Sequence, residues 1–309
     1  MRMPKANQTF LENPEINVQQ LSDSIVVERM LCALPPSTFL HRCRALFLKA
    51  GIFQIWRCQM LVRLFLSFVV VCAAMCPQLF ADTIYFPQVV DGGGYVTTFT
   101  LINSNSSSVV GTLRLFNQDG SPRTLELNGV AAFEFSVSLP AGGTIRLSSS
   151  GSGPSVIPGW ASLESTPRLQ GATTFDYRNN GLLQTTAGVF ATTAVTQALV
   201  PIAWDGSVVN TGLAIVNVEP SAAISVRATL FDESGAAVNI VGDPPLNPID
   251  TNNQIALFIT QLLPTAFAAN NTFKGSVALE VVGSGNIAVT ALTIEEGLLS
   301  AVPVIDASR

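Results

Sequence analysis

The stretch Pro87-Gln88-Val89-Val90-Asp91-Gly92, which runs on through Thr97, Phe99 and Leu101 to Asn103, has a counterpart 114 residues later. The counterpart is Pro201-Ile202-Ala203-Trp204-Asp205-Gly206, running on through Thr211, Leu213 and Ile215 to Asn217. Farther on, Phe116, Gly120, Gly159, Leu163, Glu164 and Gly181-Leu182-Leu183 have counterparts at offsets of 115 or 116. The sequence therefore predicts an internal duplication, with one domain over residues 82–195 and a second over residues 196–309.

Both copies have the pattern of short β-strands. Apolar residues alternate with Thr and Ser between clusters of Gly, Asn, Asp and Pro, and signals for helices are nearly absent. The length of each copy fits a two-sheet sandwich, with a small barrel as the alternative. We therefore predict an all-β protein of two tandem antiparallel β-sandwich (immunoglobulin-like) domains behind an N-terminal signal helix.

Several local expectations follow from the same pattern. Within residues 109–115 the apolar residues face inward and Thr112 and Arg114 face outward, while residues 117–120 and 232–235 form matching hairpin turns. Residues 243–248 are rich in proline and predict a loop, and residues 261–269 predict a short helical turn broken by Pro264. We expect the linker at residues 192–197, which is small and polar, to make few contacts.

The first 81 residues differ from the rest. Arg63, the apolar run from Leu64 to Ala74 and the small residue Ala81 have the order of a signal peptide. We predict that residues 60–81 are a signal peptide, or alternatively a signal anchor, and that residues 1–59 are a non-native or disordered upstream extension. The protein is then extracytoplasmic, and it contacts a membrane only if this segment stays uncleaved.

The composition of the part after Ala81 excludes several kinds of chemistry. Residues 82–309 contain no Cys and no His, and they hold 8 Lys and Arg against 17 Asp and Glu. A Ser-His-Asp triad, a cysteine nucleophile and an ordinary zinc site are therefore excluded. The excess of acids argues against a nucleic-acid partner, because phosphate binding depends on Lys and Arg.

Three aromatic residues are the candidates for ligand binding. Tyr95, Trp160 and Trp204 could form a platform on which a sugar ring stacks, although aromatic residues in sandwiches usually pack in the core or between domains. Three acids, Glu164, Asp176 and Glu280, could support a hydrolase that works with two carboxylates. Glu164 and Glu280 occupy matching places in the two copies, so we expect them to be solvent-facing strand residues rather than partners in one site.

The remaining polar candidates have simpler explanations. The turns Asp91-Gly92 and Asp205-Gly206 offer oxygens to Ca²⁺, but they lack the dense acid spacing of a calcium loop. Asn103 and Asn217 end matching strands, where an asparagine side chain usually binds the backbone of the following turn. We therefore predict no catalytic, cofactor-binding or metal-binding residues and no cofactor.

Certain motifs resemble those of bacterial secreted proteins with tandem immunoglobulin-like β-sandwich repeats. They are Phe86-Pro87-Gln88 with Gly92-Gly93-Gly94, the strand end Leu101-Ile102-Asn103 and the run Tyr177-Arg178-Asn179-Asn180-Gly181. The resemblance covers residues 84–304, and it implies export and a sandwich fold for a group with no established activity.

These observations favour an exported, non-enzymatic β-sandwich protein with a cell-surface, matrix or protein-interaction role. A carbohydrate-binding module is the alternative, and a carboxylate-dependent hydrolase is the less favoured third. The partners we expect are envelope proteins or polysaccharide, and not nucleic acid.

Overall fold

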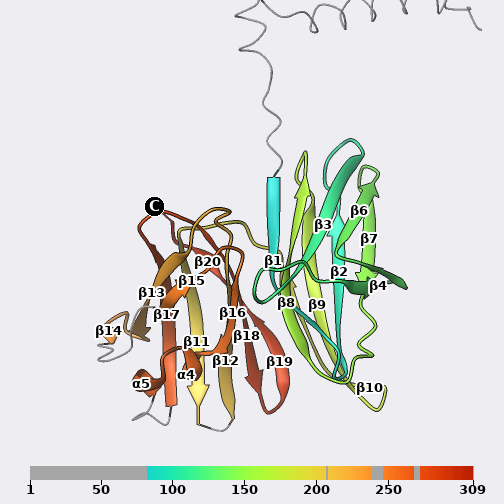
Figure 1. Cartoon of the computed structure of the whole chain (residues 1–309). Helices are drawn as coiled ribbons and strands as arrows, with labels where there is room; N and C mark the ends of the chain where they lie inside the picture. The colour runs from blue at the N-terminus through green and yellow to red at the C-terminus, as the bar shows by residue number, and fades with distance from the viewer. Residues whose placement is uncertain (1–81, 207, 239–245, 268–271, 309) are drawn as a thin grey trace, which may run out of the picture. The chain divides into compact units, whose positions relative to one another are not determined.

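The computed structural model describes residues 82–206, 208–238, 246–267 and 272–308 (Figure 1). Strands make up 66% and helices 4% of these residues, so the prediction of an all-β protein is confirmed. The predicted upstream extension and signal segment lie outside the described residues. No helix in the described ranges is both long and apolar enough to cross a membrane.

The first half of the described chain, residues 82–195, forms two antiparallel sheets of four strands. One has the order β1-β8-β3-β6 and the other β10-β9-β2-β7, while β4 and β5 form a small hairpin. The strands are β1 (Asp82–Asp91), β2 (Tyr95–Ile102), β3 (Val109–Asn117), β4 (Leu125–Leu127), β5 (Val130–Ala132), β6 (Glu134–Leu139), β7 (Thr144–Ser148), β8 (Ile157–Ser165), β9 (Gln170–Asn179) and β10 (Leu182–Phe190).

The described residues of the second half, within 196–308, form ten strands in one hydrogen-bonded system and two short helices. They are β11 (Gln197–Asp205), β12 (Val209–Asn217), β13 (Ile224–Asp232), β14 (Ala237–Val238), β15 (Leu246–Ile249), β16 (Gln254–Phe258), α4 (Ile259–Leu262), α5 (Pro264–Phe267), β17 (Thr272–Val282), β18 (Ile287–Glu295), β19 (Leu298–Val302) and β20 (Ile305–Asp306). Among the strand pairings of the described residues, the end of the β11–β12 hairpin joins its two layers, through Trp204 with Asn210 and Asp205 with Val209.

The order of the main strands is the same in both halves. In the second half β15-β13-β17-β11 follows the order of β6-β3-β8-β1, and β16-β12-β18-β19 follows that of β7-β2-β9-β10. In an immunoglobulin domain the first two strands share one sheet. Here β1 and β2 belong to different sheets, so the strand order is a different one.

Each half has its own apolar core between its two layers. Phe99 and Leu101 of β2 meet Leu113 and Leu163 of the facing sheet, and all four are fully buried. In the second core, Leu213, Ile215 and Leu279 lie at the places of Phe99, Leu101 and Leu163, and Leu230 lies at the place of the buried Leu115. The inward and outward faces predicted for residues 109–115 are confirmed, because Val109, Gly111, Leu113 and Leu115 are buried and Thr112 and Arg114 are partly exposed.

Two local predictions were wrong. The linker does not lie free of contacts: Thr192 exchanges two backbone hydrogen bonds with Tyr85, and Val195 exchanges two with Ile287. Val195 is also buried. The linker therefore forms backbone hydrogen bonds with a strand of the first half and with a strand of the second half. Residues 246–248 of the segment predicted as a loop belong to a strand, β15, in which Ile249 pairs with Ile224, while residues 243–245 lie outside the described residues.

Polar contacts join the two halves around Gln254. Its Nε2 donates to Pro87 O (2.5 Å), Gln88 Oε1 (2.8 Å) and Gly159 O (2.9 Å), and its backbone N–H donates to Gln118 O (2.8 Å). Gln254 is buried, so one side chain of β16 holds three groups of the first half. Farther along, Leu299 N donates to Thr185 Oγ1 (2.8 Å), where β19 lies beside β10.

A small apolar cluster completes this seam. Trp160 of β8 packs with Val216 and Ala288, which are fully buried on the outer face of the second half's sheet. The indole ring of Trp160 stacks on the ring of Phe116, with the two centroids 4.1 Å apart, and Trp160 Nε1 donates to Asn252 O (2.9 Å). The seam therefore fixes the outer face of β12 and β18 against the end of β8.

Two matching strand glycines give a testable prediction for the fold. A Cβ at Gly159 would overlap the carbonyl oxygen of Phe116, and one at Gly275 would overlap that of Phe231. We expect Gly159→Ala and Gly275→Ala each to lower the free energy of unfolding by about 1–3 kcal/mol, as overpacking does. Gly188 has only ordinary contacts at 3.8 Å and beyond. Gly188→Ala is therefore the control, and equal denaturant midpoints for all three variants would contradict the prediction.

Candidate functional site

The three aromatic candidates lie in three different settings. Tyr95 packs against Tyr177 (ring centroids 4.8 Å apart), and the half-buried Trp204 meets Phe267 of α5 (5.6 Å). Trp160 is only 3% exposed and belongs to the seam between the halves. No ring contact within the described residues joins any two of the three, so the structure does not bring them together as one platform.

The three acid candidates are also separate. Glu164 accepts a hydrogen bond from Arg114 (2.7 Å), Asp176 from Arg178 (3.2 Å) and Glu280 from Arg227 (3.4 Å). Glu164 and Glu280 are strand residues beside buried Leu163 and Leu279, as predicted. Each of the three acids therefore has a different arginine partner, and no contact in the described structure places two of them together.

A polar cleft lies where the first half's outer face meets loops of the second half. Its volume is about 320 Å³. The first half contributes Thr83, Tyr85, Arg114, Phe116, Trp160, Ser162 and Glu164, and the second contributes Val218, Pro220 and Asn252. These residues come from three adjacent strands, β1, β8 and β3, on which alternate residues face outward. The cleft thus combines aromatic rings, hydroxyl groups and an ion pair.

Arg114 is the centre of the charges in this cleft. Its Nη1 donates to Glu164 Oε2 (2.7 Å) and its Nε to Glu134 Oε2 (2.9 Å). These hydrogen bonds raise the pKa of the guanidinium, with the bond to Glu164 the larger cause. Two carboxylates share one arginine here, so the local charge is negative and the cleft suits a neutral or cationic ligand better than an anion.

Tyr85 reports on this electrostatic environment. Burial raises the pKa of its phenol, and the nearby Glu164 and Glu219 raise it further. Since a negative neighbour disfavours the phenolate, Tyr85 remains a hydrogen-bond donor well above neutral pH.

We expect Glu164→Gln to lower the pKa of Tyr85 while leaving it above the ordinary value for tyrosine, because burial is the larger cause and remains. Absorbance titration in a Tyr95→Phe, Tyr177→Phe background would measure it, since the chain has three tyrosines. Glu280→Gln, in the other half, is the matched control. An unchanged Tyr85 pKa in Glu164→Gln would contradict this account of the cleft.

The polar turn residues have structural contacts. Asn103 donates through Nδ2 to Ser107 O (2.8 Å) and Leu139 O (3.0 Å), and Asn217 donates to Ala222 O (2.8 Å) and Ile249 O (2.9 Å). The prediction that these asparagines bind turn backbone is confirmed. Asp91 Oδ1 accepts a hydrogen bond from Gly151 N (2.9 Å). Within the described ranges no three His, Cys, Asp or Glu side chains gather as metal ligands would.

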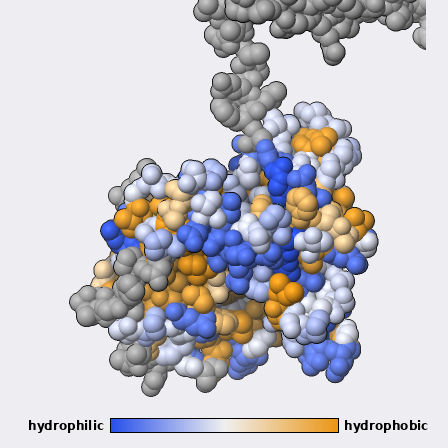
Figure 2. All heavy atoms as spheres, viewed as in Figure 1, coloured by the Kyte–Doolittle hydropathy of each residue, from blue (hydrophilic) through white to orange (hydrophobic). Residues whose placement is uncertain are grey.

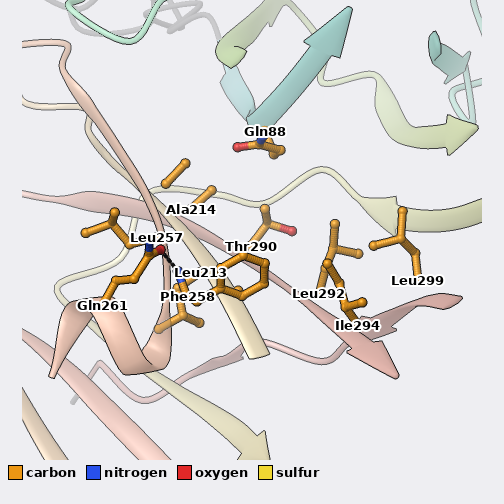
Figure 3. A pocket seen from close by; sticks show the side chains of 12 residues that line it. Gln88, Leu213, Ala214, Leu257, Phe258, Gln261, Thr290, Leu292, Ile294 and Leu299 are labelled. Carbon is orange, nitrogen blue, oxygen red and sulfur yellow. Dashed lines mark hydrogen bonds between the residues drawn. The ribbon is translucent and has the colours of Figure 1, made fainter. Parts of the chain in front are cut away.

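A second hollow lies on the other side of the seam. It is an apolar groove of about 210 Å³ on the outer face of β16, β12 and β18, with Gln88 of β1 facing it from the first half (Figure 3). Its larger apolar lining residues are Leu213, Leu257, Phe258, Leu292, Ile294 and Leu299. In the view of Figure 2, orange apolar atoms are visible on both sides of the molecule, while blue polar atoms cover much of the centre.

Sequence reasoning did not find Tyr85, Arg114, Gln88 or Gln254. Each is a strand residue, and its role depends on how one half lies against the other. The signal that was present is the outward-facing Ala288, which is apolar where the first half has Gln170.

Comparison with known proteins adds no assignment to this geometry: no protein-family model, no curated protein and no solved structure matches the chain.

Proposed function

We propose that the chain is an exported, non-enzymatic protein built from two duplicated β-sandwich units, with an interaction role at the cell surface or in a matrix. The observation that carries this proposal is that matching polar residues make corresponding structural contacts in both halves. Thr97 Oγ1 donates to Val90 O (2.6 Å), and Thr211 Oγ1 donates to Ala203 O (3.0 Å). Residues engaged in this way in both units serve the scaffold rather than a reaction.

A common origin of the two units is supported by paired details beyond the strand order. Asp119 Oδ1 accepts hydrogen bonds from the backbone and hydroxyl of Ser121, and Asp232 Oδ1 does the same for Ser234. Each unit has the size of an immunoglobulin domain and a strand order of its own. The resemblance to bacterial secreted proteins with tandem sandwich repeats is part of this proposal, as is the signal peptide at residues 60–81.

The partner we propose is an envelope protein that binds at an exposed strand edge. β6 is the outer strand of its sheet, and Ser136 and Ser138 are exposed along it beside the exposed Val110. Such an edge presents free backbone groups to which an extended segment can add as a further strand.

Recovery from envelope and matrix fractions tests this role. We expect the chain to retain a specific set of proteins, and Ser136→Lys to lose them because a charge on the edge blocks strand addition. Ser221→Lys, on a loop of the second half, is the control. Recovery of nothing, together with measurable turnover of some substrate, would refute the proposal.

A carbohydrate-binding module is the second candidate, and the polar cleft favours it. Tyr85 and Phe116 supply partly exposed rings, while the Arg114–Glu164 pair offers a donor and an acceptor side by side, as recognition of a diol requires. A glycan array with Arg114→Ala and Trp204→Ala distinguishes the cleft from the isolated tryptophan. Binding to no polysaccharide would remove this candidate.

A further inference from the structure

The apolar groove between Gln88 and the second half's sheet has no part in the proposed interaction role. Its lining includes Gly212, Ala214 and Thr290 together with the larger Phe258, Leu292 and Leu299 (Figure 3). Ala214 and Thr290 are buried, whereas Gly212, Phe258, Leu292 and Leu299 remain partly exposed at the groove.

The other half shows what this sheet face looks like without a groove. The strand pairing relates five groove residues to positions in the first half. These groove residues are Gly212, Phe258, Leu292, Ile294 and Leu299. The positions that correspond in the first half are Thr98, Ser148, Thr174, Asp176 and Thr186. All five are polar there, so strand structure alone does not require apolar residues at these places. Contact with the first half explains why the apolar Val216 and Ala288 are buried. The first half does not cover the groove residues in this way.

The groove carries no formal charge. None of its lining residues is Asp, Glu, Lys, Arg or His. Its polar groups are the amides of Gln88 and Gln261 and the hydroxyl of Thr290. The Oε1 of Gln88 accepts from Gln254, and that of Gln261 accepts from Phe258 N (3.0 Å). Among the described residues no hydrogen bond from either amide nitrogen is seen, so both can donate to an acceptor oxygen on a ligand. An apolar setting disfavours a charge.

Its size sets the scale of the ligand. A cavity of about 150 Å³ lined by Leu, Ile and Phe binds benzene, and this groove holds about 210 Å³. We propose that the groove binds a small neutral molecule with one aromatic ring or a branched chain of similar size, and with one carbonyl or hydroxyl oxygen at the Gln88 side.

Three probes of equal ring size test the chemistry on the full chain. We expect acetophenone to bind at least about 10-fold more tightly than benzoate in calorimetric titration, since burying a carboxylate costs more than burying a ketone. Toluene, which has no acceptor, falls between them. Equal binding of benzoate and acetophenone, or binding of none of the probes, would overturn the proposal.

Gly212 provides the variant that locates the site. A Cβ there would lie 3.6 Å from the Phe258 ring, an ordinary contact, so the backbone accepts a side chain at a position that lines the groove. We expect Gly212→Leu to weaken acetophenone binding at least about 10-fold, and Thr98→Leu, at the corresponding position of the first half, to leave it unchanged.

Ile294→Asp is the second variant and introduces the residue found at the corresponding position of the first half. It changes a half-exposed residue at the groove, so we expect a folded protein with at least about 10-fold weaker binding. Equal losses in Thr98→Leu and Gly212→Leu would place the binding elsewhere. A dimer that Gly212→Leu dissociates, without probe binding, would assign the groove to a second copy of the chain and overturn the proposal.

Discussion

Replacing Asn217 by alanine is expected to lower the free energy of unfolding by about 3–5 kcal/mol, and the same change at Asn103 should cost as much, because each buried group left unpaired costs about 1–3 kcal/mol. Both side chains are fully buried. The Nδ2 of Asn217 donates to Ala222 O, Ile249 O and Asp250 O, and its Oδ1 accepts from Glu219 N. Alanine removes all these bonds at once and leaves a cavity.

Chemical denaturation of the two variants measures this cost. Asn117→Ala is the matched control, since its amide bonds to Ser121 and Pro122 are exposed and water can replace them. We expect a loss of about 0.5–1 kcal/mol there. If Asn217→Ala and Asn117→Ala had the same midpoint, the buried asparagine would not be holding the strand end to its turn.

The strands whose position depends only on the local sequence pattern were predictable. In β3 and β13, apolar residues alternate with polar ones, and this period of two sets both the element and its buried face. The turns at Asp119 and Asp232 follow from Asp, Ser and Gly, whose side chains and backbones favour a tight turn.

Segments whose structure depends on pairing with residues far away in the sequence were not predictable in the same way. β15 contains Pro248 and reads as a loop, but its pairing with β13 holds Ile249 in the core. The linker has a loop's composition, yet Tyr85 and Ile287, far away in sequence, bind its backbone. Hydrogen bonds of this kind depend on the folded arrangement, and a local window does not contain their partners.

Both hollows depend on the seam, and this explains why the cleft and the groove were missed. Tyr85 and Arg114 line a cleft only because Val218 and Asn252 close its other side. The comparison of the two copies did contain a signal, namely outward positions that are apolar in one copy and polar in the other. A duplicated chain therefore gives more information where its copies differ than where they agree.

Leu101→Ala is expected to cost about 2–5 kcal/mol, as truncation of a buried leucine does, and Ile215→Ala should cost a similar amount in the other half. Both side chains are fully buried, in two separate clusters. Because the seam buries mainly Trp160, Val216 and Ala288, we expect each change to lower the stability of its own half and to affect the other only slightly.

Fragments 82–195 and 196–309, expressed separately, test this independence. At about 0.05–0.15 kcal/mol per residue, a domain of this length has roughly 6–17 kcal/mol of stability, and the sheets of the two halves share no strand among the described residues. We therefore expect each fragment to unfold cooperatively, with Leu101→Ala shifting only the first transition and Ile215→Ala only the second. A fragment that is disordered alone would mean that the seam around Gln254 and Trp160 is required for folding, and that residues 82–309 form one cooperative unit.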